Sequence, residues 1–291
     1  MKHSVTLPAY AKVNLYLSVL GKRPDGYHEL LTLFERITLA DQVTVQRTRT
    51  GEVELECDSP MVPHDAGNLA VRAVEVFRKA SSWSDGIRIR LEKNVPVGAG
   101  LGGGSSDAAA VLVALQELSD SVLSKEQLLD CARNIGADVA FFVAQVPWAL
   151  GKGRGDQIEP VSEGTRVWHL LVTPDFAIPT KEVYQAFSPS PGLTGSGPDV
   201  TLLLRALKDN QSFRVREFLF NALEPTVEAL YPAIRDVKAV VQMPGGLVRP
   251  CVSGSGSTVF AVCDSEAQGR AAADQIHRQE PGWRVAVVAT A

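Results

Sequence analysis

Features that would mark a membrane protein or a nucleic-acid-binding protein are missing from this sequence. No apolar run approaches the roughly 20 residues that a membrane-spanning helix needs, and the first ten residues, MKHSVTLPAY, lack the apolar core of a signal peptide. Charge of one sign is not in large excess either, because 29 Lys and Arg stand against 33 Asp and Glu, a net charge of −4. This balance provides no field that attracts nucleic acid or anionic lipid, so we expect neither as a partner.

Cysteine is also scarce. The four cysteines, Cys57, Cys131, Cys251 and Cys263, are scattered, and no two stand at the close spacing of a zinc site or a redox pair. We therefore expect four free structural thiols in a protein that works in the reducing cytoplasm.

The composition that remains is that of an ordinary globular protein, with 45% hydrophobic and 21% charged residues. A chain of 291 residues is long enough for two domains. Strand-like and helix-like segments are mixed without strict alternation, which favours the α+β class over a doubly wound parallel sheet. Residues 150–165 are rich in glycine and charge, and they indicate a boundary between one domain at 1–160 and a second at 161–291.

Hydrophobic periodicity predicts the elements around which a site could form. In AKVNLYLSVL, residues 11–20, Val13 and Leu15 alternate with Lys12 and Asn14, a period of two that predicts a half-buried strand. Further strands are expected at 36–48, 52–57, 86–93, 139–144, 167–172, 258–263 and 283–290. Helices are expected at 68–80, from about 106 to 118, at 124–136, at several places between 181 and 242, and after residue 265.

Glycine is concentrated in one segment, PVGAGLGGGSSDAA at 96–109, where five of the seven residues 98–104 are glycine. A flexible linker is a poor interpretation, because patterned elements flank the segment on both sides without a polar spacer. A dinucleotide-binding loop is also disfavoured. Gly98, Gly100 and Gly103 match its spacing, but the preceding strand is amphipathic and KNVPV separates it from the first glycine. We therefore favour a phosphate-binding loop at the N-terminus of a helix, where bare backbone N–H groups meet an anion.

The lysine of a P-loop ATPase is missing from this segment, because Gly104 occupies its position when the motif is counted from Gly98. An ATPase of that kind is thereby excluded. Ser105 and Ser106 offer hydroxyl donors for phosphate oxygens. The charge of a triphosphate must then be met by another cation, for which Lys12 and a metal ion are the candidates.

The same segment resembles the central motif of the galactokinase, homoserine kinase, mevalonate kinase and phosphomevalonate kinase superfamily. PAYAKVNLYLSVLGKRPDGYHEL, at 8–30, is similar to the N-terminal signature of one family within it, the 4-diphosphocytidyl-2-C-methyl-D-erythritol kinases. GADVAFF and SGSGSTVFAV resemble the remaining motifs of that family, so the resemblance runs from about Pro8 to about Val262. Two positions depart from the family pattern: Ala140 stands where proline is common, and Asp107 where relatives carry a neutral amide.

The resemblance implies a two-domain fold, with an N-terminal ribosomal-protein-S5-like ATP-binding domain and a C-terminal ferredoxin-like α/β sandwich that binds substrate. It also implies transfer of the γ-phosphoryl group of ATP to the 2-hydroxyl of 4-diphosphocytidyl-2-C-methyl-D-erythritol, in the non-mevalonate route to isoprenoid precursors. That reaction needs a carboxylate near the hydroxyl and a cation near the γ-phosphate. By the family match these are Asp138, the catalytic base, and Lys12, which stabilises Asp138 and the transferring group.

The resemblance further implies a set of binding residues. For ATP these are Asn68, Pro96, Val97, Gly98, Ala99, Gly100, Leu101, Gly102, Gly103, Gly104, Ser105 and Ser106. For the cytidine substrate they are Asn14, Tyr27, His28, Thr180 and Tyr184. In this arrangement the cytosine lies between the rings of Tyr27 and Tyr184, while His28 hydrogen-bonds its edge.

ATP and Mg²⁺ are the cofactors that the resemblance implies. Mg²⁺ should be bound largely through ATP oxygens and water. Its protein ligands stay unassigned, with Ser106 and Asp107 as the nearest candidates. We expect a monomer or a homodimer.

Other interpretations stay open at this point. The chain could be another kinase of the superfamily, acting on mevalonate, homoserine or a sugar, although DGYHEL argues against enzymes that bind no cytidine. It could also be a nucleotide- or RNA-binding module, since the expected N-terminal fold occurs in ribosomal proteins. The acidic net charge argues against that. Asn68 and Asp138 could each be no more than a residue that caps a helix.

Overall fold

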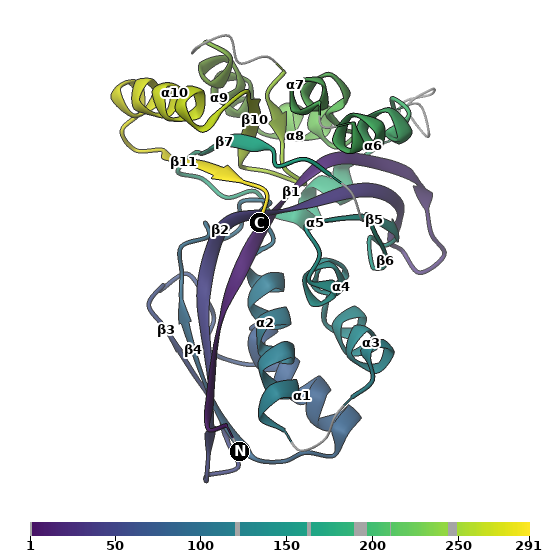
Figure 1. Cartoon of the computed structure of the whole chain (residues 1–291), viewed down its shortest axis with the longest axis vertical. Coiled ribbons are helices and arrows are strands. Elements are labelled where there is room, and N and C mark those ends of the chain that lie inside the picture. The colour runs from purple at the N-terminus through teal and green to yellow at the C-terminus, as the bar shows by residue number, and fades with distance from the viewer. Residues whose placement is uncertain (1, 120–122, 162–163, 189–196, 210, 244–248) are drawn as a thin grey trace.

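The computed structural model describes residues 2–119, 123–161, 164–188, 197–209, 211–243 and 249–291. The chain forms two lobes (Figure 1), a lower one in which helices cover a tall sheet and an upper one in which helices cover a smaller sheet. Each lobe combines a sheet with helices, so the α+β class expected from the sequence is confirmed. Among the described residues, no helix combines the length and the apolar character needed to cross a membrane.

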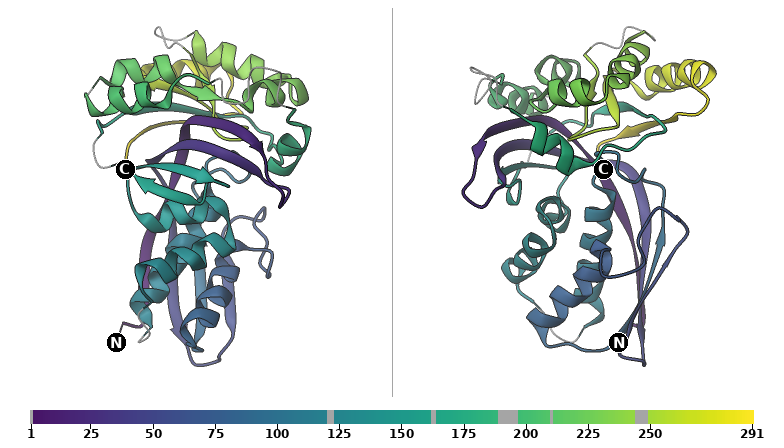
Figure 2. Two further views of the ribbon diagram at one scale, coloured as in Figure 1. Left: turned by 90° about the vertical axis from the view of Figure 1, so that its right-hand side faces the viewer. Right: turned by 180° about the vertical axis from the view of Figure 1, so that it is seen from behind.

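The tall sheet has the strand order β3-β4-β2-β1-β8, with β5 attached to part of β2 and β6 attached to β5. Its strands are β1 (Ser4–Lys22), β2 (His28–Thr48), β3 (Val53–Cys57), β4 (Gly86–Glu92), β5 (Trp148–Gly153), β6 (Gln157–Pro160) and β8 (Phe220–Asn221). β1 and β2 pair antiparallel along nearly their whole length, and this hairpin runs from the foot of the lower lobe into the upper lobe (Figures 1 and 2). The hairpin is therefore shared by both lobes.

Four helices cover one face of the tall sheet (Figure 1). They are α1 (Leu69–Ser81), α2 (Gly103–Leu118), α3 (Lys125–Ile135) and α4 (Ala137–Ala144). Their apolar sides, which include Phe77 and Leu112, are fully buried in one cluster with strand residues such as Ile87. Burial of side chains of this size contributes about 1.5–3 kcal/mol each, so this layer stabilises the lower lobe.

Two expectations about these elements are wrong. Residues 139–144 belong to helix α4 and not to a strand. The run is buried from Val139 to Phe142, and a short apolar run without a clear period fits either a strand or a buried helix. The strand expected at 11–20 is not half-buried, because every residue from 11 to 19 is buried. Its polar face, with Lys12 and Asn14, is buried and lines a partly open cavity.

The upper sheet has the order β11-β7-β10-β9 and is antiparallel throughout. Its strands are β7 (Trp168–Thr173), β9 (Cys251–Val252), β10 (Val259–Cys263) and β11 (Arg284–Ala289). Counted within this lobe the order is 4-1-3-2, the ferredoxin-like arrangement that was expected. The helices here are α5 (Thr180–Ala186), α6 (Val200–Lys208), α7 (Ser212–Val215), α8 (Glu224–Leu230), α9 (Ala233–Gln242) and α10 (Glu266–Gln279), with a 3₁₀ turn at Arg216–Phe218. The four cysteines are free, as expected.

A buried polar cluster joins the lobes. His169 on β7 is hydrogen-bonded to Glu35 of β2, with 2.9 Å between Nε2 and Oε2. Thr290 donates to the other carboxylate oxygen of Glu35 at 2.5 Å, and both His169 and Glu35 are fully buried. β8 also crosses between the lobes, because it pairs with β1 in the tall sheet. The division into 1–160 and 161–291 stays a prediction, and residues 162–163 beside it lie outside the described part of the chain.

Candidate active site

A cavity of about 1240 Å³ lies where the two lobes meet. Its wall is built from β1, the start of β2, the glycine-rich loop and the start of α2 in the lower lobe. α5 and the loop that holds Gly254 and Ser255 complete it from the upper lobe. A pocket for one drug-sized ligand usually measures about 300–1,000 Å³. The cavity therefore has room for two ligands at once.

The glycine-rich loop forms one side of this cavity. Gly98, Gly100 and Gly102 have φ angles of +69°, +75° and +72°, values that L side chains rarely adopt. At Gly100 a Cβ would also overlap the carbonyl oxygen of Ser253, because the loop packs closely on the upper lobe. These glycines are therefore required by the backbone itself.

Helix α2 begins at Gly103, three residues earlier than expected. Gly103, Gly104 and Ser105 consequently form its first turn, whose N–H groups have no partner within the helix. All three residues line the cavity, whereas Ser106 is buried and is not part of the wall. The loop and the helix start thus present backbone N–H groups to the cavity, and the binding of phosphate by them stays a prediction.

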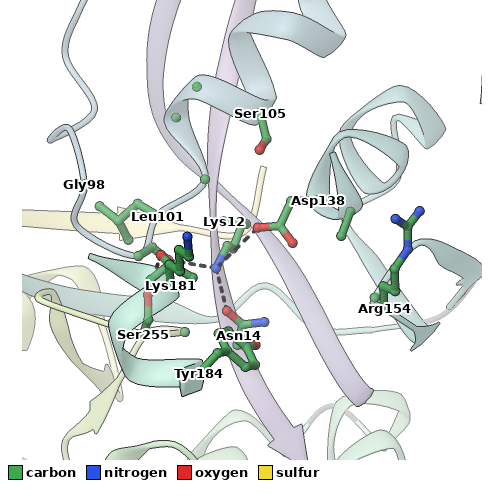
Figure 3. A pocket seen from close by; sticks show the side chains of 18 of the residues that line it. Lys12, Asn14, Gly98, Leu101, Ser105, Asp138, Arg154, Lys181, Tyr184 and Ser255 are labelled. Carbon is green, nitrogen blue, oxygen red and sulfur yellow. Dashed lines mark hydrogen bonds and ion pairs between the residues drawn. The ribbon is translucent and has the colours of Figure 1, made fainter. Parts of the chain in front are cut away.

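Lys12 lies at the centre of the cavity wall and is 4% exposed. Its ammonium donates to Asn14 Oδ1 at 2.5 Å and to the carbonyl oxygen of Gly100 at 2.7 Å. The Asp138 carboxylate is 3.9 Å away (Figure 3). Burial lowers the pKa of Lys12 from its ordinary value, and the charge of Asp138 offsets part of that effect. The structure thus brings together two residues that are far apart in the sequence.

Asp138 stands in the first turn of α4, two residues after the N-cap Gly136, and its side chain is one-third exposed and lines the cavity. The structure shows no capping hydrogen bond from a side chain at the N-cap of this helix. A carboxylate with access to solvent and an ammonium beside it can accept a proton from a bound hydroxyl group. This pair can therefore support chemistry on an alcohol.

A second charged cluster lies beneath the glycine-rich loop and was not predicted. Lys93 donates to Asp107 Oδ2 at 2.6 Å and also forms an ion pair with Asp41. Asp41 in turn accepts from the backbone N–H groups of Asn94 and Val95, at 2.5 and 2.7 Å, just before the loop. The cluster therefore fixes the start of the loop to β2 and α2.

The cluster also explains what Asp107, one of the departures from the family pattern, does in this chain. Burial raises the pKa of Asp107 to about 7, against the opposing effect of Lys93. Burial acts to lower the pKa of Lys93, but the two carboxylates raise it above its ordinary value. One carboxylate oxygen of Asp107, Oδ2, is thus engaged by Lys93. No local sequence pattern could have revealed this, because the three residues come from separate elements.

Aromatic rings lie together at the end of the cavity away from the glycine-rich loop. The centroids of His28 and Tyr184 are 5.5 Å apart, and Phe187 meets His28 edge-on at 6.0 Å. Tyr27 is 57% exposed, with the guanidinium of Arg154 over its ring at 5.2 Å. Burial, followed by the nearby Lys22, lowers the pKa of His28, so its ring is neutral at pH 7 and can both donate and accept a hydrogen bond.

The remaining predicted residues also reach the cavity. Asn68 lines the wall, but both of its side-chain groups are already used. Its oxygen accepts from Ala70 N at 2.9 Å as the N-cap of α1, and its nitrogen donates to the carbonyl oxygen of Pro63 at 2.8 Å. Thr180 shares a hydrogen bond with Ser255, 2.8 Å between the hydroxyl oxygens. The helix-cap interpretation of Asn68 is therefore what the structure shows, and its contact with ATP stays a prediction.

Besides Lys93, three cations in the wall were missed in the sequence: Lys22, Arg154 and Lys181. Arg154 lies in the glycine-rich, charged segment that was interpreted only as a domain boundary. Single lysines and arginines carry no local signal that separates a cavity wall from solvated surface.

Comparison with protein families gives two matches that together cover more than half of the chain. The model described as "GHMP kinases N terminal domain" matches residues 68–145, and "GHMP kinases C terminal" matches residues 192–282. The two matches confirm the two-domain kinase fold expected from the sequence.

Individual relatives extend this similarity to nearly the whole length. A 4-diphosphocytidyl-2-C-methyl-D-erythritol kinase of Citrifermentans bemidjiense is 40% identical over 284 residues, 98% of each chain. One from Desulfotalea psychrophila is 41% identical over 256 residues, 87% of this chain and 84% of the relative.

Solved structures show the same relationship as the sequence comparisons. A crystal structure of a 4-(cytidine 5′-diphospho)-2C-methyl-D-erythritol kinase superposes with a TM-score of 0.79 at 35% identity, covering 98% of both chains. A homoserine kinase from Cytophaga hutchinsonii shares the fold alone, with a TM-score of 0.78 at 19% identity over 100% of this chain and 95% of the other. The chain therefore belongs to the GHMP kinases and, within them, to the family of 4-diphosphocytidyl-2-C-methyl-D-erythritol kinases.

Proposed function

We propose that the chain transfers the γ-phosphoryl group of ATP to the 2-hydroxyl of 4-diphosphocytidyl-2-C-methyl-D-erythritol. The observation that carries this proposal is the position of Lys12 and Asp138. The pair lies between the glycine-rich loop on one side and the rings of His28 and Tyr184 on the other, within one cavity. ATP then occupies the loop, the cytidine occupies the ring-lined end, and the hydroxyl group and the γ-phosphate meet at Lys12.

In this mechanism Asp138 accepts the proton of the 2-hydroxyl as its oxygen forms a bond to the γ-phosphorus. The bond from that phosphorus to the β-phosphate oxygen breaks, and ADP leaves with the electron pair. The transition state of such transfers is loose, so the protein acts mainly by positioning groups and stabilising charge. Lys12 supplies a positive charge there, and the N–H groups of Gly103 and Gly104 hold the phosphates.

Mg²⁺ fits this site as an ion that arrives with ATP. Among the described residues no group of three or more His, Cys, Asp or Glu side chains could hold a metal ion. Asp107 is paired with Lys93, but its Oδ1 has no hydrogen-bond partner in the described part of the chain. When bound, Mg²⁺ neutralises charge on the phosphates, and the oxygen ligands it prefers are those of ATP, water and one carboxylate. Asp107 and Ser105 are the residues that would hold it.

At the cytidine end, His28 offers one donor and one acceptor to the edge of the base, because its ring is neutral. Tyr27 and Tyr184 supply the stacking surfaces. Stacking on an aromatic side chain contributes about 1–3 kcal/mol per base. We also propose a cytoplasmic location, which the four free cysteines support.

A coupled assay of ADP release tests the proposal. The purified protein should turn over ATP with 4-diphosphocytidyl-2-C-methyl-D-erythritol, and turnover should be lost when the cytosine is replaced by uracil, because the wrong base edge leaves the polar groups of His28 unpaired. Turnover with mevalonate, homoserine or galactose, and none with the cytidine substrate, would instead establish another kinase of the superfamily.

A further inference from the structure

Two cations of the cavity wall have neither a partner among the described residues nor a role in the mechanism described so far. Three of the five Lys and Arg side chains that line the cavity are engaged: Lys12 with Gly100, Lys93 with Asp107, and Arg154 with Asp156. Within the described part of the chain, Lys22 and Lys181 have neither a hydrogen bond nor an ion pair from their ammonium groups. Lys22 lies beside His28, whose pKa it lowers, at the ring-lined end. Lys181, an exposed residue of the wall, is therefore an uncompensated charge away from the ring-lined end.

The position of Lys181 is fixed by contacts of its own helix. The preceding residue, Thr180, shares a 2.8 Å hydrogen bond with Ser255. The neighbour of Ser255, Gly254, lies so close to the reacting centre that a Cβ there would be 3.2 Å from Lys12 Nζ. Figure 3 shows Lys181 at the level of Lys12, on the side of Lys12 opposite to Asp138. The start of α5 is thus attached to the loop that borders Lys12.

The same helix also carries Tyr184, three residues further on. Side chains at this spacing lie on the same face of a helix, about 5–6 Å apart at their Cβ atoms. Tyr184 contacts His28 at the ring-lined end, and Figure 3 shows Lys181 at the level of Lys12, with Tyr184 below it. One face of α5 therefore presents first the ring of Tyr184 and then the ammonium of Lys181. This order leads from the ring-lined end of the cavity towards the reacting centre.

The acceptor molecule has its groups in the same order. A cytidine diphosphate alcohol runs from base to ribose, to diphosphate and then to the alcohol, so its diphosphate lies between the stacked base and the reacting hydroxyl group. We propose that Lys181 binds the oxygens of this diphosphate. This inference rests on the proposed function, because it takes the substrate to be a cytidine diphosphate alcohol.

The chemistry of the two groups supports this assignment. The lysine ammonium is a compact charge with three donors, suited to phosphate oxygens. Since Lys181 has no carboxylate partner among the described residues, phosphate binding breaks no existing ion pair. The triphosphate of ATP has its own partners in the glycine-rich loop and the first turn of α2. The acceptor diphosphate would otherwise have no cation assigned to it.

The test uses binding to the intact protein and does not depend on turnover. Calorimetry should compare the wild type, Lys181→Gln and Lys79→Gln, with CDP, cytidine and ADP as probes. Lys79, an exposed lysine in the last turn of α1, is the matched control for loss of one positive charge. We expect Lys181→Gln to raise the Kd of CDP about tenfold or more, the loss of one charge-assisted hydrogen bond. The Kd values of cytidine and ADP should change by less than about twofold, as should all three in Lys79→Gln.

The possible outcomes separate this inference from the proposed function. If the wild type binds CDP and Lys181→Gln binds it equally well, Lys181 does not contact the diphosphate and the inference is overturned. If Lys181→Gln weakens the binding of ADP instead of that of CDP, the lysine binds the phosphoryl donor, which also overturns the inference. If the wild type binds neither CDP nor cytidine, the proposed substrate itself is wrong. Lys181→Arg, which keeps the charge, should restore most of the affinity for CDP.

Discussion

The ammonium of Lys12 donates a hydrogen bond to the carbonyl oxygen of Gly100, 2.7 Å away, and thereby ties strand β1 to the glycine-rich loop. Ser253 donates to the same oxygen from the upper lobe, at 3.0 Å. Lys12 therefore supports the shape of the nucleotide loop in addition to placing its charge beside Asp138. Asp138 projects from α4, and its carboxylate lies 3.9 Å from the Lys12 ammonium. Substitution of the two residues should consequently have different effects.

Asp138→Ala should lower kcat by about two to four orders of magnitude, because it removes the proton acceptor at the reacting hydroxyl group. Binding of ATP, measured by calorimetry, should barely change. Lys12→Ala should lower kcat by a similar amount and should also weaken the binding of ATP, because the Gly100 carbonyl group loses the hydrogen bond from Lys12. A folded Asp138→Ala protein that keeps more than about a tenth of the wild-type turnover rules Asp138 out as the base.

The pH profile of kcat should fall on its alkaline side earlier than an ordinary lysine would allow. Burial lowers the pKa of Lys12 below 10.5, so the ammonium loses its proton, and with it the charge needed at the phosphate, at a lower pH. Below that pKa the charged form is retained and the alkaline effect is absent. Lys12→Arg keeps its charge at high pH, so its residual activity should lack this alkaline fall. An unchanged fall in that variant would assign it to another group.

Gly104→Ala should weaken the binding of ATP without destabilising the fold. Apart from its chain neighbours and the backbone of α2, no atom of the described residues lies within 4 Å of the position that a Cβ would take at Gly104. This residue stands in the first turn of α2, where alanine is tolerated. The methyl group would therefore meet only the ligand. Calorimetry should show weaker ATP binding together with an unchanged Tm and unchanged binding of CDP.

Gly100→Ala provides the contrast, since its φ of +75° and its contact with Ser253 make the substitution destabilising with or without ligand. Wild-type affinity for ATP in Gly104→Ala would show that phosphate does not approach this turn.

Tyr27→Ala and Tyr184→Ala should each raise the KM of the cytidine substrate by about one to two orders of magnitude, through loss of base stacking. The KM of ATP should stay close to its wild-type value. Tyr27 is 57% exposed, so its variant should keep the wild-type Tm. His28→Ala should in addition narrow the preference for cytidine over the uridine analogue. An unchanged KM for the cytidine substrate in both tyrosine variants would disprove the stacking arrangement.

The features predicted well from the sequence are those with a local cause. The glycine-rich loop is one of them, because the positive φ at Gly98, Gly100 and Gly102 is a property of single residues and the helix follows directly. The strand pattern around Lys12 is another. A period of two alone predicts that the polar face meets solvent, and only the resemblance to the kinase family placed Lys12 and Asn14 in a site. The second lobe, which closes over both residues, turns that face into a cavity wall.

The features that were missed depend on contacts between distant segments. Helix α4 was mistaken for a strand because Val139 to Phe142 are buried on every side, so no period of 3.6 remains visible in the sequence. The cluster of Lys93 with Asp41 and Asp107 joins a loop, a strand and a helix, and each charge taken alone fits a solvated surface. The ion pair that explains Asp107 exists only in the folded chain.

The long β1–β2 hairpin has a mechanical consequence for the reacting centre. Both lobes contain parts of the paired strands β1 and β2. This pairing is stiff, because bending the hairpin stretches the hydrogen bonds between the two strands everywhere except at irregularities. The register shifts between Tyr10 and Ala11 and again between Asn14 and Tyr16, and these two irregularities flank Lys12. A third irregularity lies between Val19 and Gly21, so two of the three points at which the ladder bends most easily flank the segment that carries the ammonium. Bending of the hairpin at these points changes the distance between the Lys12 ammonium and the Asp138 carboxylate.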